Sequence, residues 1–281
     1  MTPNVRMCLN TGTIRGQKRN LAESIGIAAE AGYDGIEPWI DEIEQSERSG
    51  TPVRDLKRML ADRGVRVESA IGFAEWIVDD PERRRSGMEQ MKRDMDLVRQ
   101  IGGNRIAAPP AGATEVEGMP TIVIAERYRA ILDLGQSLGV TPQLEIWGFS
   151  RTLGRLSEAV AAILETDRPD ACLLADIYHL HRGGSGFAGL RFLNAATMHV
   201  FHMNDYPSHP PREALRDSDR VLPGDGAAPL DTALAALISA GFAGALSLEI
   251  FNEAQWKRPA LDVARDGIAR MRALVARHAS A

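Results

Sequence analysis

Cysteine and histidine are scarce in this chain of 281 residues, which contains two cysteines and six histidines. Cys8 and Cys172 form no Cys-x-x-Cys motif, and both lie in apolar runs, which favours buried small side chains in a reducing compartment. The chain has no stretch of about 18 uncharged apolar residues, and its first ten residues lack the pattern of a signal peptide. We therefore expect a cytoplasmic protein without a membrane span.

A basic excess is also missing from the composition. The net charge is −5 and the pI is about 5.8, which argues against a protein held on nucleic acid by general electrostatics. Hydrophobic residues make up 44% of the chain, so a packed globular core is expected. Because no linker or change in composition divides the chain, we predict one domain over residues 1–281, with a homo-oligomer left open.

What the chain does contain is a repeated alternation of short apolar runs and longer helical patterns. The expected strands cover residues 5–10, 33–39, 65–73, 104–110, 141–148, 170–180, 198–205 and 245–251. The expected helices cover residues 18–32, 53–64, 81–103, 121–139, 156–167, 186–196, 229–244 and 262–279. Eight such units in this length predict a single (β/α)8 TIM barrel of the α/β class. A doubly wound open sheet is the alternative, but the first strand is not followed by a Gly-x-Gly-x-x-Gly motif.

Four polar side chains fall near the C-terminal ends of four consecutive predicted strands: Glu145, Asp176, His202 and Glu249. Active sites of such barrels lie at this end of the strands. Side chains alternate along a strand, and a single phase turns all four toward the barrel axis while leucines and isoleucines face the helices. Because three carboxylates and an imidazole would be unstable together without a cation, the sequence predicts one bound divalent metal. A set rich in oxygen ligands favours Mn²⁺, with Mg²⁺, Co²⁺ or Zn²⁺ as alternatives.

These residues also carry a resemblance to a known family. The segments LEIW, ADIYHL, HMND, RVLPGDG and LEIF resemble the xylose-isomerase-like barrel superfamily, and the resemblance covers nearly the whole chain. That superfamily includes sugar isomerases, ketose 3-epimerases, hydroxypyruvate isomerase, inosose dehydratase and endonuclease IV. The resemblance implies that the same four residues bind the metal and that Glu145 and Glu249 also move the substrate proton. It further implies that His179 and Arg220 contact substrate.

Other side chains near the predicted rim have two interpretations each. Glu37 is either a wall of the site or a structurally paired carboxylate, and Trp147 either stacks on a sugar ring or packs in the core. Asp205 is either a functional acid or the cap of a turn. Glu68 is expected in the middle of a strand, in a structural role.

The chemistry that this site favours is proton transfer next to a carbonyl group. A metal that chelates a carbonyl and a neighbouring hydroxyl of a keto sugar stabilises an enediolate, and the two glutamates then isomerise or epimerise the substrate. Loss of a hydroxyl from the same intermediate would make the protein a dehydratase or lyase acting on an inosose or keto-glycoside.

Two further functions agree less well with the sequence. An endonuclease IV-like phosphodiesterase needs extra histidines near the second and third strands, and the first histidine of this chain is His179. A barrel that binds a sugar or a partner without catalysis is mildly disfavoured by the complete ligand set. We expect a substrate without phosphate, because the loop after the last strand has no glycine and its first charged residue, Glu253, would repel a phosphate group. Lys257 and Arg258, which follow in the same loop, are the possible phosphate anchors.

Overall fold

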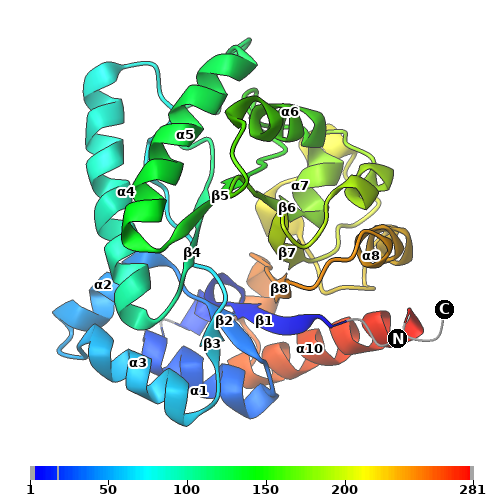
Figure 1. The fold of residues 1–281 in the computed structure, drawn as a ribbon. Coiled ribbons are helices and arrows are strands. Elements are labelled where there is room, and N and C mark those ends of the chain that lie inside the picture. Colours follow the sequence, from blue (N-terminus) through cyan, green and yellow to red (C-terminus); the bar gives the residue numbers. More distant parts are fainter. Residues whose placement is uncertain (1–3, 18, 279–281) are drawn as a thin grey trace.

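The protein is described by a computed structural model over residues 4–17 and 19–278, which form a barrel of parallel strands surrounded by helices (Figure 1). The strands are β1 (Arg6–Asn10), β2 (Gly35–Glu37), β3 (Arg66–Val67), β4 (Arg105–Ala108), β5 (Thr141–Glu145), β6 (Leu173–Asp176), β7 (Met198–Met203) and β8 (Ala245–Leu248). They pair in the order β3-β2-β1-β8-β7-β6-β5-β4. Ala70, after β3, exchanges backbone hydrogen bonds with Arg105 and Ala107 of β4, which closes the ring. The predicted (β/α)8 barrel is confirmed.

Helices cover the outer face of the strands. They are α1 (Leu21–Ala31), α2 (Ile40–Arg48), α3 (Val53–Asp62), α4 (Pro81–Ile101), α5 (Thr121–Leu138), α6 (Leu156–Thr166), α7 (Ile177–Arg182), α8 (Leu230–Ser239), α9 (Glu253–Trp256) and α10 (Ala260–Arg277). Short 3₁₀ helices are η1 (Thr11–Gln17), η2 (Phe187–Phe192), η3 (Arg212–Ala214) and η4 (Asp217–Asp219). Helix α1 illustrates the local signals: Asn20 and Glu23 form a capping box at its start, and Gly32 ends it in the left-handed conformation.

Two predicted elements need correction, and one helix was missed. The sixth strand was predicted to continue to residue 180, but it ends at Asp176, because that side chain caps α7 by accepting the backbone N–H of His179. The helix predicted at 186–196 is only the short η2. Helix α2 was not predicted, because most of its sequence IDEIEQSER is charged or polar. Its buried residues, Ile40, Ile43 and Ser46, nevertheless follow the spacing of one helix face. The predicted helix ends at Lys18 and Ala279 lie outside the described residues.

The interior of the barrel is divided into layers along its axis. An apolar layer occupies the middle, formed by Cys8, Ile71, Ala107, Leu174, Val200 and Ala245. Toward the N-terminal ends of the strands lies an ion pair, with Arg6 Nε 2.6 Å from Glu68 Oε1. Gly35 makes room for it, since a Cβ there would lie 2.5 Å from Glu68 Cγ. The structural role expected for Glu68 is therefore correct.

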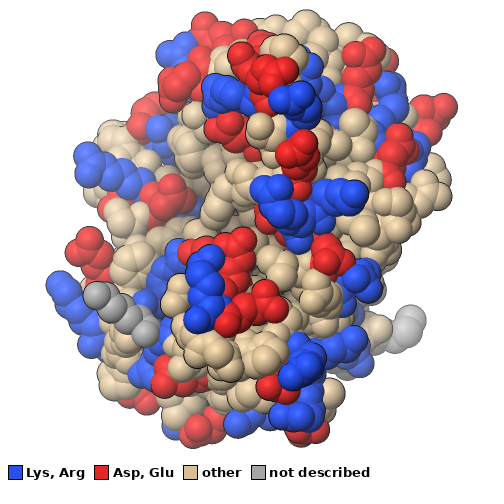
Figure 2. Space-filling view, turned by 90° about the vertical axis from the view of Figure 1, so that its left-hand side faces the viewer, with Lys and Arg blue, Asp and Glu red and all other residues tan. Residues whose placement is uncertain are grey.

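The surface carries charges of both signs. Lys and Arg side chains alternate with Asp and Glu side chains over the face shown in Figure 2, without a broad field of one sign. None of the described helices is long and apolar enough to cross a membrane.

Candidate active site

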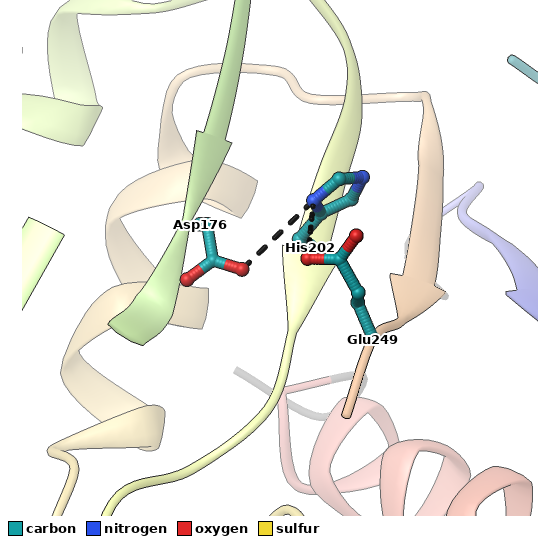
Figure 3. A group of neighbouring side chains, drawn as sticks. All are labelled: Asp176, His202 and Glu249. Atoms are coloured by element: carbon teal, nitrogen blue, oxygen red, sulfur yellow. Dashed lines mark ion pairs between the residues drawn. The ribbon is translucent and has the colours of Figure 1, made fainter. Parts of the chain in front are cut away.

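Three potential metal ligands converge at the C-terminal end of the barrel (Figure 3). Asp176 ends β6, His202 lies in β7, and Glu249 directly follows β8, so the three come from neighbouring strands. One ligand atom from each lies within 4.8 Å of the others, and all three side chains are buried. Strand order and side-chain alternation thus bring together residues that are up to 73 positions apart (249 − 176).

Asp176 is held in place by the start of the next helix and by one buried amide. Its Oδ1 accepts the backbone N–H of His179 at 2.7 Å. Its Oδ2 faces the site and accepts a hydrogen bond from Asn204 Nδ2 at 2.8 Å. Asn204 is fully buried and also accepts the backbone N–H of Tyr178. Both carboxylate oxygens are therefore fixed in direction before any ligand binds.

His202 is oriented by a carboxylate on each side of its ring. Nε2 lies 2.9 Å from Glu37 Oε2, whereas Nδ1 lies 3.1 Å from Glu249 Oε2 and 3.9 Å from Asp176 Oδ2. Burial alone would lower the pKa of His202, but the charges of Glu249 and Glu37 outweigh it and raise the pKa well above its usual value. Nδ1 is therefore the nitrogen that faces the other two candidate ligands, and Nε2 faces away from them.

Glu249 shows the complementary shift. Burial would raise the pKa of Glu249, but His202 and Arg220 outweigh it and hold that pKa well below the usual range. Arg220 donates from Nη1 to Glu249 Oε2 at 2.6 Å and to Asp176 Oδ2 at 3.1 Å. Glu249 is thus stabilised as a carboxylate, directly after an apolar strand, by ion pairs with two buried cationic side chains.

Glu145, the fourth predicted ligand, is in the same pocket but outside the group of three. It ends β5 and is buried, and its Oε2 has no hydrogen-bond partner among the described residues. Burial raises the pKa of Glu145 to about 8; the charge of Glu249 adds to this effect and that of His202 opposes it. The structure therefore unites three of the four predicted ligands directly and places Glu145 beside them.

His179 and Arg220, both predicted to contact substrate, touch each other at the pocket wall. His179 Nε2 lies 3.0 Å from Arg220 Nη2, and His179 Nδ1 lies 3.2 Å from the backbone N–H of Gly148. Burial, together with the nearby Arg220 charge, lowers the pKa of His179. Because a neutral imidazole has one acceptor nitrogen, only one of these two contacts can be a hydrogen bond at a time. Arg220 also pairs with Asp217, which the sequence analysis did not single out.

Aromatic rings form most of the remaining pocket wall. The cavity measures about 210 Å³ and is lined by Trp39, Phe73, Trp147, Phe149 and Phe251 together with the polar groups described above. Trp147 stacks on Phe149 with ring centroids 5.4 Å apart and approaches Phe73 at 6.0 Å. The chain has only 15 Phe, Tyr and Trp residues in total (7 + 4 + 4), so one third of them surround this pocket. Trp147 therefore belongs to the wall of the site and is available for stacking on a ring.

Two other predicted residues have structural partners. Glu37 is fully buried beneath the pocket, where Oε2 accepts hydrogen bonds from Asn10 and Ser247 as well as facing His202. Asp205 accepts backbone N–H groups of Tyr206, Gly224, Gly226 and Ala228. These contacts favour structural pairing for Glu37 and turn capping for Asp205, the second of the interpretations given for each.

Asn10 and Asn204 were missed by the sequence analysis although both end or follow strands at the active end of the barrel. Asn10 Nδ2 donates to Glu37 Oε2 and to Glu249 Oε1, each at 3.0 Å. The rule that singled out the carboxylates applies equally to Asn10, the last residue of β1. Asn204 stands two residues after His202, so alternation alone would have placed both on the same face.

The donor set fits a divalent cation. It offers two carboxylates and an imidazole within one buried group, with a third carboxylate next to it. Neither ring nitrogen of His202 makes an aligned hydrogen bond within the described residues, although each lies close to a carboxylate. Buried polar atoms without partners are costly unless a further ligand satisfies them.

Comparisons with known proteins agree with this fold. The chain matches the xylose isomerase-like TIM barrel family over residues 25–274 and belongs to that family. The inosose isomerase of Bacillus licheniformis is 24% identical over 268 residues, which are 93% of this chain and 94% of that protein. The 3-dehydroshikimate dehydratase of Pseudomonas aeruginosa is 26% identical over 250 residues, which are 88% of this chain but 39% of that longer protein.

A solved structure adds to the comparison. The structure described as an IOLI protein with a bound zinc atom has a TM-score of 0.89 at 22% identity, and covers 99% of this chain and 100% of its own. That likeness confirms the fold. The curated relatives are named as isomerases and dehydratases, which supports the prediction of an enzyme from the sugar isomerase and epimerase group.

Proposed function

We propose that this protein is a divalent-metal-dependent isomerase or epimerase that acts on an unphosphorylated keto sugar or cyclic keto polyol. The observation that carries the proposal is the convergence of Asp176, His202 and Glu249 beside Glu145, at the bottom of a pocket of about 210 Å³. Asp176, His202 and Glu249 would hold the cation, with Glu145 as a further ligand. A bound cation would supply Lewis-acid polarisation of a substrate carbonyl.

The remaining chemistry is assigned to side chains of this chain. Glu145 and Glu249 line the pocket, and either carboxylate is placed to take a proton from the carbon next to the carbonyl while the other returns one. Return to the opposite face of the same carbon gives an epimer, and return to the neighbouring carbon gives an isomer. His179 and Arg220 would position substrate hydroxyls at the wall.

The pocket favours a neutral ring-shaped substrate. Its wall of aromatic rings suits the apolar face of a sugar or cyclitol ring. Arg220 is the one Lys or Arg side chain among the described residues that line it, and that guanidinium is already paired with Asp176, Asp217 and Glu249. Arg258, considered above as a phosphate anchor, pairs instead with Asp266. A phosphate group would therefore find no free cation in the pocket.

A dehydratase is the second candidate, and the match to the Pseudomonas aeruginosa 3-dehydroshikimate dehydratase favours it. Both reactions begin with the same proton abstraction. They differ in whether a hydroxyl leaves the neighbouring carbon afterwards, and the side chains of the pocket serve either outcome.

A deuterium-exchange screen tests the proposal. The protein is incubated with Mn²⁺ in D₂O and a panel of ketoses, inososes and 3-dehydroshikimate, each ketose also being supplied as its phosphate ester. Deuterium should enter next to the carbonyl of an unphosphorylated compound, and the accumulating product distinguishes isomer, epimer and dehydrated compound. A clear preference for the esters would overturn the substrate class. Absence of exchange and of product across the panel would count against the proposed chemistry as a whole.

A further inference from the structure

A second cavity lies at the opposite end of the barrel from the candidate active site. It measures about 530 Å³ and opens among the N-terminal ends of β1, β3 and β4. The charged residues of its lining are Arg6, Lys57, Arg66, Arg105 and Glu68, that is, four cationic side chains and one acidic side chain. The apolar middle layer of the barrel separates this cavity from the metal-ligand group.

Glu68 does not neutralise the cavity, because its carboxylate is occupied by Arg6. Arg6 Nε lies 2.6 Å from Glu68 Oε1 and Arg6 Nη2 lies 3.0 Å from Glu68 Oε2, a bidentate pair. Among the described residues, Lys57, Arg66 and Arg105 have no carboxylate oxygen within 4.0 Å. These three side chains form no ion pair within the described residues, so the positive charges of the lining exceed the single negative charge of Glu68.

Arg105 is the most unusual of the three. Its side chain is partly buried, and its one side-chain hydrogen bond to a described residue runs from Nη1 to Asn104 Oδ1 at 3.1 Å. Burial lowers the pKa of Arg105; the nearby Glu68 charge opposes this effect, and the Arg6 charge adds to it. A guanidinium that is withdrawn from water without a carboxylate partner costs free energy, which a bound anion would offset.

The positive potential of the cavity extends to a neighbouring histidine. The pKa of His199, in β7, is lowered to about 4 by burial and then by the charges of Arg105 and Arg6. His199 is therefore neutral at physiological pH and adds a polar group to this end of the barrel without adding charge.

From this geometry we propose that the cavity binds a small molecule through a phosphate group, with Arg105 and Lys57 as its principal contacts and Arg66 at the edge. Arginine matches a phosphate with two parallel hydrogen bonds, and lysine adds a mobile point charge. The volume exceeds that of one phosphate, so the ligand is either inorganic phosphate with water or the phosphate end of a small ester. The site does not depend on the proposed catalytic function.

Calorimetric titration of the whole protein tests the site, with inorganic phosphate and glycerol 3-phosphate as probes and sodium chloride at matched ionic strength as reference. Arg105→Gln and Lys57→Gln should each weaken phosphate binding by about tenfold, the scale of one charged hydrogen bond. Lys57 is exposed, so its substitution keeps the test valid if the Arg105 variant is unstable. Arg54→Gln, an exposed charge on the same helix but outside the lining, is the matched control and should bind as the parent does.

The two probes also identify the form of the ligand. Equal binding of both assigns the site to the phosphate group alone, and tighter binding of the ester assigns it to a phosphorylated metabolite. Phosphate binding should also raise the NMR-measured pKa of His199, because it neutralises the cations that lower it. Heats no larger than those of chloride, or an equal loss in Arg54→Gln, would overturn the proposal whatever the enzyme's activity.

Discussion

His202 and Glu37 form a fully buried pair, with Nε2 of the imidazole 2.9 Å from Oε2 of the carboxylate. The pair fixes the ring so that Nδ1, and not Nε2, faces Asp176 and Glu249. Histidine ligands of metals commonly turn the second nitrogen toward a carboxylate in this way. Glu37 is thus placed to position the metal ligand, and Asn10 and Ser247 hold Glu37 in turn.

Glu37→Gln should weaken binding of a divalent ion by about 10- to 100-fold, because the amide neither attracts the imidazole N–H as strongly nor raises the basicity of the ring. Titration of metal-free protein with Mn²⁺ measures the change. Glu253→Gln, an acid in α9 outside the lining of the pocket, is the control for a lost negative charge. Unchanged affinity in the Glu37 variant would show that this carboxylate has no part in orienting His202.

Glu145→Gln and Glu249→Gln should each reduce deuterium exchange by at least about 100-fold, the usual scale of general acid–base catalysis. Each amide keeps one oxygen as a metal ligand but removes the base. We expect metal binding to be weakened only in part, with a smaller loss for Glu145, which stands outside the group of three. Full exchange in either variant would mean that this residue moves no proton.

Metal binding should become tighter as the pH rises through neutrality. In the metal-free protein the pKa of His202 is raised well above its usual value, and burial raises that of Glu145 to about 8. At pH 7 each of these groups therefore holds a proton that a cation must displace, and raising the pH removes this competition. Calorimetry at about pH 6 and about pH 8, in buffers of different ionisation enthalpy, measures the affinity and the protons released. Equal affinity without proton release would contradict these assignments.

Much of the fold was predictable because each β/α unit carries its own signal. The eight strands alternate with amphipathic helices in the sequence, and local features such as the capping box of Asn20 and Glu23 confirm where helices begin. The failures were also local. The apolar run after Asp176 was assigned to a strand, whereas one side-chain cap converts it to α7. Helix α2 was missed because its polar composition concealed the spacing of its buried residues.

The residues of the candidate site that lie at strand ends could be predicted from the sequence. The contacts that depend on loops or that cross the barrel could not. Asp176, His202 and Glu249 meet because parallel strands bring their carboxyl ends to one edge. The pairing of Arg220 with two of these carboxylates depends on the long connection after β7, whose path the sequence pattern does not define. The pairing of Glu37 with His202 crosses the barrel interior between strands that are not neighbours in the sheet.

Asp94 offers a prediction about stability alone. This residue of α4 is 3% exposed, its Oδ2 has no hydrogen-bond partner among the described residues, and burial raises its pKa to about 6. The folded state therefore holds this proton more tightly than the unfolded chain, so stability falls as the pH rises from about 4 to about 6 and the full penalty remains above that range.

Asp94→Asn should stabilise the protein at pH 7.5 by roughly 1–3 kcal/mol and should have little effect below about pH 4, where the parent carboxyl is already neutral. Urea unfolding at the two pH values gives the difference. Glu89→Gln makes the same charge change at an exposed position of α4 and should leave stability nearly unaltered. A variant that is less stable at pH 7.5 would indicate that Asp94 is ionised and stabilised in the fold.

The most direct test of the metal centre is anomalous diffraction from crystals of the protein soaked in Mn²⁺. We expect one strong peak per chain, bonded to Asp176, to Nδ1 of His202 and to Glu249, with Glu145 beside it, and no such peak in His202→Ala. A peak bonded to Nε2 of His202 would contradict the orientation given by Glu37. Ordered side chains without a peak, at a Mn²⁺ concentration that saturates any binding seen in solution, would show that these residues do not form a metal centre.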